Sequence, residues 1–417
     1  MTCRVCGGVR LELFLDLGEQ PHCDSLLRSL DLDRHEPTYP LQVFYCHDCT
    51  TVQIGYTVPK EVMFSEYLYV SGTTEALRAH FRDSTDKLVK NLRLRPEDLV
   101  VDIGSNDGTW LSCYEKYEMK VLGVECAGNL AMIARTSGIE TITRFFSAEV
   151  AAEIIKEYGR PRLVTAAGVF FHLEELHSVT QGVAELCADG GVFCVQAIYL
   201  GEILRQTQFD NIYHEHLTYW SLRSLERLFA MHGLEVFSAN LLPIHGGSLE
   251  ILAGLKGAHP IDPSVERMRL EEKGRGLESI GAYREFASRV WKIKEELLEI
   301  LGRYKAAKKK VFAFGAPAKG ATLLNSFKIT FADIPCAVER NPLKFGLSIP
   351  GARIPIIDEK EAEVPDAYLI LPWNFLSEFL RKKHDFIMAG GSFIVPIPRP
   401  MVIDRSNYYS YCEGRLP

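Results

Sequence analysis

The sequence predicts an α/β protein made of a small N-terminal metal-binding module and two Rossmann-like domains. Two Cys-x2-Cys pairs lie at positions 3–6 and 46–49. An apolar strand runs into a glycine-bounded turn at 100–108, and a second strand and turn follow at 310–320. Because 417 residues are too many for one compact core, we expect separate domains, which we place at 1–65, 66–256 and 257–417.

The composition is that of an ordinary globular protein, and its net negative charge argues against nucleic acid and anionic membranes as partners. Hydrophobic residues make up 47% of the chain, and the formal net charge is −7. An acidic balance offers no general attraction to nucleic acid or to anionic membranes. No stretch is apolar for long enough to span a bilayer, and the N-terminus lacks an apolar signal core. We therefore expect a cytoplasmic monomer without nucleic-acid or membrane partners.

The two cysteine pairs predict a structural zinc site formed by Cys3, Cys6, Cys46 and Cys49. Each pair places two thiolates on one tight turn, and four thiolates complete a tetrahedral shell that has no open position. The alternative is four unrelated buried thiols. The other cysteines lack such spacing and are expected to be packing residues: Cys23, Cys113, Cys126, Cys187, Cys194, Cys336 and Cys412.

The middle of the chain alternates between strands and helices, as open parallel sheets do. Segment 61–91 is predicted to be largely helical, with Tyr67 and Tyr69 at its entry. The glycines after the first strand let a ligand approach the backbone, and Glu125 ends the second strand, where doubly wound folds hold ribose hydroxyls. The predicted parallel strands are 99–104, 120–125, 141–145, 162–168 and 191–197, and an antiparallel pair follows at 234–245 and 248–255.

Five parallel strands closed by a hairpin are typical of methyltransferases that bind S-adenosylmethionine. A nicotinamide domain would more often show Gly-x-Gly-x-x-Gly and a sixth parallel strand. The turn here reads Gly-Ser-Asn-Asp-Gly, so we predict S-adenosylmethionine as the cofactor. The residues expected to bind it are Asp102, Gly104, Ser105, Asn106, Asp107, Glu125, Phe146 and Ala167.

The C-terminal part is predicted to form a second α/β unit. A charged helix at 283–307 precedes a strand at 310–314, a turn at 315–320 and a helix through Leu324. Such a turn at a helix N-terminus can bind phosphate through backbone N–H groups, and Lys319 would add a positive charge. A plain strand–helix connection is the alternative. Further strands are expected at 336–339 and 367–371.

An insertion at 209–219, between the last parallel strand and the hairpin, carries an unusual density of titratable side chains. It contains Tyr213, His214, Glu215 and His216, at the sheet edge where open α/β sheets bind ligands. These residues could instead cap helices or fill the core. A zinc-protease site is disfavoured because the two histidines lack helical spacing. We prefer an acid–base cluster, to which His172, after the fourth strand, could contribute.

Taken in order, these motifs are similar to those of the sugar C-methyltransferases that act on dTDP-linked 4-ketosugars in the biosynthesis of branched deoxysugars, including antibiotic sugars. The resemblance covers nearly the whole chain. It implies an N-terminal zinc domain, a central S-adenosylmethionine domain and a C-terminal Rossmann-like domain that helps to hold the dTDP-ketosugar. Besides the cysteine pairs, the matching segments are 67–72, 104–108, 213–216, 245–248, 315–320 and 372–374.

The resemblance also implies roles for individual residues. The base would be His216, which would remove a proton beside the ketone before the enolate carbon is methylated, C3 being favoured over C5. Tyrosine hydroxyls and His172 would donate hydrogen bonds to the enolate oxygen. The remaining active-site positions would be Tyr213, Glu215, Tyr67 and Tyr69. Substrate-binding positions would be His214, His245, Gly246, Lys319, Asn325 and Arg340.

The chain departs from the family pattern at several positions, among them 21–24, which reads Pro-His-Cys-Asp. These departures bear on the identity of the sugar more than on the type of reaction. Two other functions are weighed against methyl transfer to carbon. One is a nucleotide-sugar oxidoreductase or epimerase that uses NAD, and the other is a zinc-module binding protein or RNA methyltransferase, which the acidic composition disfavours.

Overall fold

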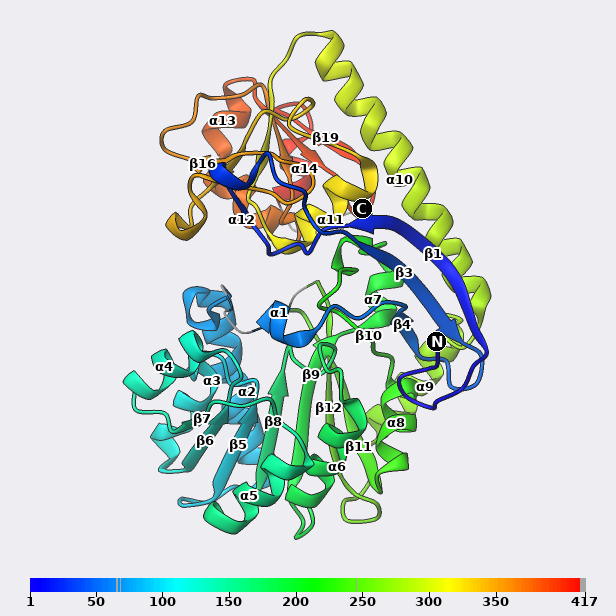
Figure 1. The fold of residues 1–417 in the computed structure, drawn as a ribbon, viewed down its shortest axis with the longest axis vertical. Helices are drawn as coiled ribbons and strands as arrows, with labels where there is room; N and C mark the ends of the chain where they lie inside the picture. The colour runs from blue at the N-terminus through cyan, green and yellow to red at the C-terminus, as the bar shows by residue number, and fades with distance from the viewer. Residues whose placement is uncertain (65–66, 68, 245, 413–417) are drawn as a thin grey trace.

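The central sheet has seven strands, of which five are parallel, as predicted. The computed structural model describes residues 1–64, 67, 69–244 and 246–412 (Figure 1). The hairpin strand β12 pairs antiparallel with β9, and β11 pairs antiparallel with β12. The strand order is β11 (Leu234–Leu242), β12 (Ser248–Leu255), β9 (Val192–Ile198), β8 (Leu163–Ala167), β5 (Leu99–Ile103), β6 (Lys120–Val124) and β7 (Thr141–Ile142).

The edge strand β7 is shorter than the predicted range of 141–145. It has a partner on one side only, and the chain leaves the sheet after Ile142. Arg144 then pairs with Glu153 at 2.6 Å, and the Phe145 ring lies 4.6 Å from the Lys60 ammonium. The helices of this domain are α2 (Glu75–Leu92), α3 (Thr109–Ser112), α4 (Gly128–Thr136), α5 (Ala148–Tyr158), α6 (Leu176–Leu186), α7 (Leu200–Arg205) and α8 (Leu222–Met231).

Segment 61–91 is largely helical, as predicted, but the helix is interrupted. Helix α1 covers Lys60–Phe64, a 3-10 turn covers Ser71–Thr73, and α2 begins at Glu75. Between them the backbone N–H groups of Ser71 and Gly72 donate to side chains of the turn after β5 rather than to helical carbonyls. A tertiary contact therefore outweighs local helix propensity here.

The N-terminal sheet contains strands from two parts of the chain. Its order is β1 (Leu11–Gln20), β3 (Tyr39–Cys46), β4 (Val52–Ile54) and β10 (Thr218–Tyr219), and β10 belongs to the insertion of the central domain. Strand β2 (Leu27–Arg28) pairs instead with β15 (Leu347–Ser348) of the C-terminal domain. Figure 1 shows β1 and β3, in blue, running beside the long helix α10 (Ile280–Ala306). The N-terminal segment thus contacts both larger domains.

The C-terminal domain is a second α/β unit, as predicted. All strands of its main sheet are parallel except β19. The sheet order is β16 (Ile356–Asp358), β14 (Ala337–Glu339), β13 (Val311–Phe314), β17 (Ala367–Ile370), β18 (Ser392–Val395) and β19 (Met401–Ile403). The helices of this half are α9 (Pro263–Gly274), α10, α11 (Ala318–Phe327), α12 (Leu376–Lys382), α13 (His384–Met388) and α14 (Tyr408–Cys412).

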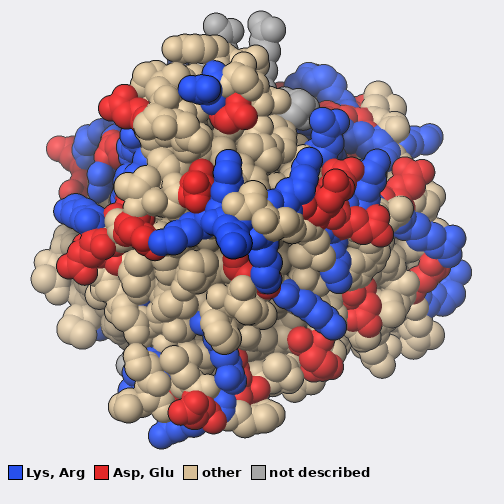
Figure 2. All heavy atoms as spheres, turned by 90° about the horizontal axis from the view of Figure 1, so that it is seen from above, with Lys and Arg blue, Asp and Glu red and all other residues tan. Residues whose placement is uncertain are grey.

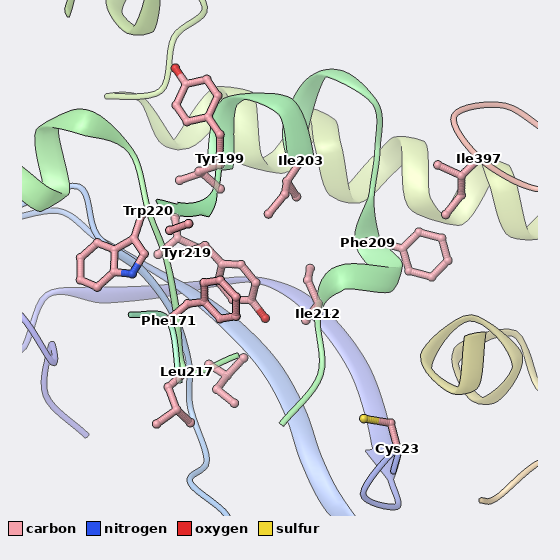
Figure 3. Packing of buried hydrophobic residues seen from close by; sticks show 14 of the residues in the cluster. Cys23, Phe171, Tyr199, Ile203, Phe209, Ile212, Leu217, Tyr219, Trp220 and Ile397 are labelled. Carbon is pink, nitrogen blue, oxygen red and sulfur yellow. The ribbon is translucent and has the colours of Figure 1, made fainter. Parts of the chain in front are cut away.

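The insertion packs between the other parts of the molecule. Phe209 stacks on Phe327 of α11, with ring centroids 4.9 Å apart. Figure 3 shows Phe171, Ile212 and Tyr219 close together. The Cys23 sulfur is directed toward the chain segment that follows Ile212. All six of these residues are buried. Apolar burial therefore fixes the insertion against both the N-terminal segment and the C-terminal domain.

The surface carries charges of both signs. On the face shown in Figure 2, basic and acidic side chains lie side by side. Among the described residues, no helix is long and apolar enough to cross a membrane.

Candidate active site

The turn after β5 is shaped to bring a ligand against the backbone. Gly104 and Gly108 have φ angles of +69° and +78°, a region that glycine adopts without strain. The N–H of Asn106 donates to Glu125 Oε2 at 2.8 Å, and the N–H of Ala127 donates to Oε1 at 2.8 Å. Glu125 is thereby fixed at the sheet edge where ribose hydroxyls bind in such folds.

A short segment before α2 covers this turn. Ser71 N–H donates to Asn106 Oδ1 at 2.9 Å, and Gly72 N–H donates to Asp107 Oδ2 at 2.9 Å. A Cβ on Gly72 would lie 2.5 Å from that carboxylate oxygen, so a larger residue would require the Asp107 side chain to shift. The Asn106 amide donates in turn to the Tyr69 carbonyl at 3.0 Å. Tyr69 therefore lies beside the turn.

The other predicted cofactor residues surround the same turn. Asp102 is buried and accepts a hydrogen bond from Thr165 Oγ1 at 2.6 Å, and burial raises the pKa of its carboxyl to about 7. Ser105 Oγ is buried and has no hydrogen-bond partner within the described part of the chain. Phe146 is buried and Ala167 ends β8. The fixed carboxylate of Glu125 suits a nucleoside with hydroxyl groups.

Glu125→Gln is expected to weaken S-adenosylmethionine binding by about tenfold or more, because hydrogen bonds to a charged acceptor contribute about 1.5–3 kcal/mol. An amide would also turn its NH2 group toward one of the two backbone N–H donors. The Kd should be measured by calorimetry, with the exposed Glu157→Gln as the control. An unchanged Kd would exclude Glu125 from the cofactor site.

Five of the predicted catalytic residues form one cluster. The His216 ring lies 3.9 Å from the Tyr213 ring and 5.1 Å from the His172 ring, measured between centroids. The Tyr67 hydroxyl donates to Glu215 Oε2 at 3.0 Å. Glu215 and His216 are 1% and 3% exposed, so water screens the charge of Glu215 little. Tyr69 is the one predicted catalytic residue that lies at the cofactor turn instead.

Backbone carbonyls determine the tautomers of both histidines. His216 Nδ1 lies 2.7 Å from the Asn211 carbonyl oxygen, and His172 Nδ1 lies 2.7 Å from the Glu215 carbonyl oxygen. A carbonyl can only accept, so in each neutral ring Nδ1 carries the proton and Nε2 the lone pair. Burial lowers the pKa of His172 and keeps it neutral. In the neutral ring the proton of His172 lies on Nδ1, toward the Glu215 carbonyl, and its role as a hydrogen-bond donor to substrate stays a prediction.

The N-terminal segment adds residues that the sequence analysis did not assign to the site. His22 Nε2 lies 3.0 Å from Glu215 Oε1, and the Cys23 thiol donates to the same oxygen at 3.8 Å. Cys23 is buried as predicted, but it packs against Glu215 of the cluster rather than against apolar residues alone. The only signal in the sequence was the departure of 21–24 from the family pattern. Nothing in that stretch indicates that it meets residue 215.

The His22–Glu215 pair is expected to stabilise the fold in a defined pH window. Burial alone would raise the pKa of Glu215, but the close His22 imidazole and the other histidine charges nearby lower it to about 2. Burial opposes the charge of His22, yet Glu215 raises the pKa of that ring. The Glu215 carboxylate contributes its full stabilisation above its unfolded-state pKa of about 4.3. The His22 imidazolium contributes its full stabilisation below its unfolded-state pKa of about 6.5.

The free energy of unfolding of the parent should therefore exceed that of His22→Gln by about 2 kcal/mol between about pH 4.3 and 6.5. The difference should shrink as the pH falls toward 2, where Glu215 becomes protonated, and as it rises through the raised pKa of His22. Urea unfolding of the parent and of His22→Gln at a series of pH values measures this difference in the free energy of unfolding. A difference that does not vary with pH would contradict the ion pair.

The predicted substrate residues His214, of the insertion, and Gly246, of the hairpin, bond to other parts of the protein. The His214 ring lies edge-on to Tyr39, its Nε2 lies 3.2 Å from the Tyr39 carbonyl oxygen, and burial lowers its pKa to about 4. It therefore ties the insertion to β3. The Gly246 carbonyl accepts from the amides of Gln206 and Gln208 at 2.9 and 2.7 Å. His245 lies outside the described residues, as does the side chain of Cys412.

The predicted substrate residues of the C-terminal domain do not form one group. Lys319 Nζ donates to Asn374 Oδ1 at 2.6 Å and lies 4.6 Å from the centroid of the Trp373 ring. Asn325 donates to the Pro350 carbonyl at 3.0 Å. Arg340 is exposed and pairs with Glu359. Lys319 reaches the insertion, because its ammonium is 3.9 Å from the buried carboxylate of Asp210.

The Asp210 carboxylate joins the insertion to the C-terminal domain. Trp373 Nε1 donates to its Oδ2 at 2.7 Å, and its Oδ1 is buried with no hydrogen-bond partner among the residues that the structure describes. Burial raises the pKa of this carboxyl and lowers that of Lys319. Neither Asp210 nor Trp373 was assigned to the site from the sequence.

The four predicted zinc ligands converge. The Sγ atoms of Cys3 and Cys49 are 3.5 Å apart, those of Cys6 and Cys46 are 3.7 Å apart, and all four lie within 4.8 Å of one another. A tetrahedral zinc ion with Zn–S bonds of about 2.3 Å separates its sulfurs by about 3.8 Å. The four thiols fit that geometry, and the four sulfurs leave no position for a substrate.

Comparison with known proteins assigns each part of the chain. Family models match residues 3–64 as "Putative zinc binding domain", residues 74–239 as methyltransferase domain and residues 243–398 as C-methyltransferase C-terminal domain. C-methyltransferase NovU of Streptomyces niveus is 38% identical over 408 residues, which cover 97% of each chain. The chain belongs to the C-methyltransferase family.

Membership in this family confirms the predicted type of enzyme and its cofactors. The protein is an S-adenosylmethionine-dependent C-methyltransferase with a zinc-binding N-terminal domain. Solved structures that resemble the methyltransferase part include an S-adenosylmethionine-dependent methyltransferase from Anabaena variabilis, with a TM-score of 0.36 and 18% identity, over 47% of this chain and 91% of that one. The PH0226 protein from Pyrococcus horikoshii has a TM-score of 0.35 and 16% identity, over 45% and 95% respectively.

Proposed function

We propose that this C-methyltransferase removes a proton from C3 of a dTDP-linked 4-ketodeoxysugar and methylates that carbon, in the biosynthesis of branched or antibiotic sugars. A sugar carbon is not a nucleophile, but a neighbouring ketone makes its C–H bond acidic enough to form an enolate. The observation that carries the proposal is the buried His216 with its Nδ1 bonded to the Asn211 carbonyl. That bond leaves Nε2 as the nitrogen that can accept a proton.

Tyr213 is the proposed donor to the enolate oxygen. Burial and the charge of Glu215 raise the pKa of its phenol well above the ordinary value, so the hydroxyl stays protonated. Its ring lies 3.9 Å from the ring of His216. A donor placed where negative charge develops is a large source of catalysis. His172, whose Nε2 is an acceptor in the neutral ring, is proposed to orient the substrate or to relay the proton.

The cofactor and the nucleotide are proposed to lie on either side of the insertion. S-adenosylmethionine, when bound, supplies an electrophilic methyl group on a sulfonium sulfur. Glu125 and the turn after β5 would hold its nucleoside, and the C-terminal domain, which we place at 257–417, would hold the dTDP group. Lys319 lies in the first turn of α11 and could neutralise a phosphate. We further propose that the protein acts as a cytoplasmic monomer.

The proposal is tested by incubating the enzyme with S-adenosylmethionine and a panel of dTDP-4-ketosugars, and locating the new methyl group by NMR. Methylation at C3 is the expected result. A product methylated at C5 would show that the enzyme methylates C5, the alternative position, and not C3. Turnover that requires added NAD and leaves no new methyl group would favour an oxidoreductase or epimerase and overturn the proposal.

A further inference from the structure

The N-terminal segment carries a charged side chain into the catalytic cluster. His22 is 7% exposed, and its Nδ1 lies 3.1 Å from Ser25 Oγ, so the ring is held on one side while Nε2 faces Glu215. Strand β1 ends at Gln20, whose amide donates to Leu17 and Ser326 at 3.0 and 2.8 Å. The backbone that positions His22 is therefore anchored within its own sheet and to helix α11.

The positive charge of His22 balances the negative charge of Glu215. The imidazolium of His22 opposes the carboxylate at 3.0 Å. Burial and the charge of Glu215 raise the pKa of the Asp24 carboxyl to about 7, although the charges of Lys344 and His22 act to lower it. Tyr67 and Cys23 contribute only neutral donors. The His22–Glu215 ion pair therefore has no net charge to offer a substrate.

We propose that His22 is a specificity-determining residue, which cancels the charge of Glu215 so that the acceptor is a ketosugar with an uncharged hydroxyl, rather than an ammonium group, beside its reacting carbon. The inference rests on the proposed function, which seats that carbon at His216, the residue next to Glu215. A buried charge without a partner costs several kcal/mol. A sugar ammonium would be such a charge in the parent, whereas without His22 it could pair with Glu215.

The experiment compares two dTDP-4-ketosugars that differ only in a hydroxyl or an amino group beside the methylated carbon. The parent should prefer the hydroxyl sugar in kcat/KM by at least about tenfold. His22→Asn should shift the ratio of the two kcat/KM values toward the amino sugar by about tenfold or more. His22→Lys, which restores a positive charge, should keep the preference of the parent.

Zinc content and the Kd of S-adenosylmethionine report whether each variant is folded. Equal losses of kcat/KM on both acceptors in His22→Asn would mean that the residue is only structural and would overturn the inference. So would a parent enzyme that prefers the amino sugar, a measurement that needs no variant. If the parent methylated neither acceptor, the proposed function would fail instead, and the two failures are thus distinguishable.

Discussion

His216→Asn is expected to lower methyl transfer by about 10³-fold or more, because general-base catalysis contributes about 10²–10⁴-fold. Asparagine has no nitrogen that accepts a proton near neutral pH. If His216 is the base, exchange of the acidic C3 hydrogen into deuterated water should be lost together with methylation. Both rates can be followed by NMR on the same sample, with and without S-adenosylmethionine.

The exchange measurement separates the base from a residue that only binds substrate. Retained exchange with lost methylation would place the base elsewhere, and the next candidate is His172, whose Nε2 also carries a lone pair. His35→Asn is the matched control, because this histidine is exposed and distant in sequence from the insertion. The Kd of S-adenosylmethionine should be unchanged in both variants.

Replacing Cys46 and Cys49 together by serine is expected to abolish zinc binding and to lower activity by about 100-fold or more, since bound zinc contributes about 10 kcal/mol to folding in small zinc domains. The N-terminal sheet contains β10 of the insertion, and the N-terminal chain places His22 beside Glu215. Loss of zinc should therefore disturb the cluster although no cysteine of the zinc site belongs to it.

Zinc content by elemental analysis, thermal unfolding and the rate of methyl transfer should be measured on the same preparation. Cys113→Ser is the control, because this thiol is half-buried and donates to the Thr109 carbonyl, outside the zinc site. A variant that lost zinc but kept the parental kcat would contradict the coupling between the N-terminal sheet and the active site.

Features with a local chemical cause were predictable from the sequence. The zinc site was predictable from the spacing of Cys3, Cys6, Cys46 and Cys49, because two thiolates on one tight turn suit zinc. The turn at 104–108 and Glu125 at the end of β6 follow from the backbone geometry of a parallel sheet, in which successive strand ends meet at one edge. The contiguous run Tyr213–His216 was visible because it concentrates titratable side chains in four positions.

Contacts between distant segments were not predictable, because no local pattern encodes them. His22 meets Glu215 only because β1 and the insertion belong to one packed assembly. The break between α1 and α2 exists because the turn after β5 takes the N–H groups of Ser71 and Gly72. The tautomers of His172 and His216 depend on carbonyls that folding brings to 2.7 Å.

By itself, the sequence determined the two α/β domains, the zinc ligands, the cofactor and the residues of the insertion that could carry chemistry. The tertiary structure decided which of those residues accept protons and which charges cancel. Proton positions and buried charges depend on distances of a few ångströms between residues far apart in the chain. Only packing of the whole molecule sets those distances.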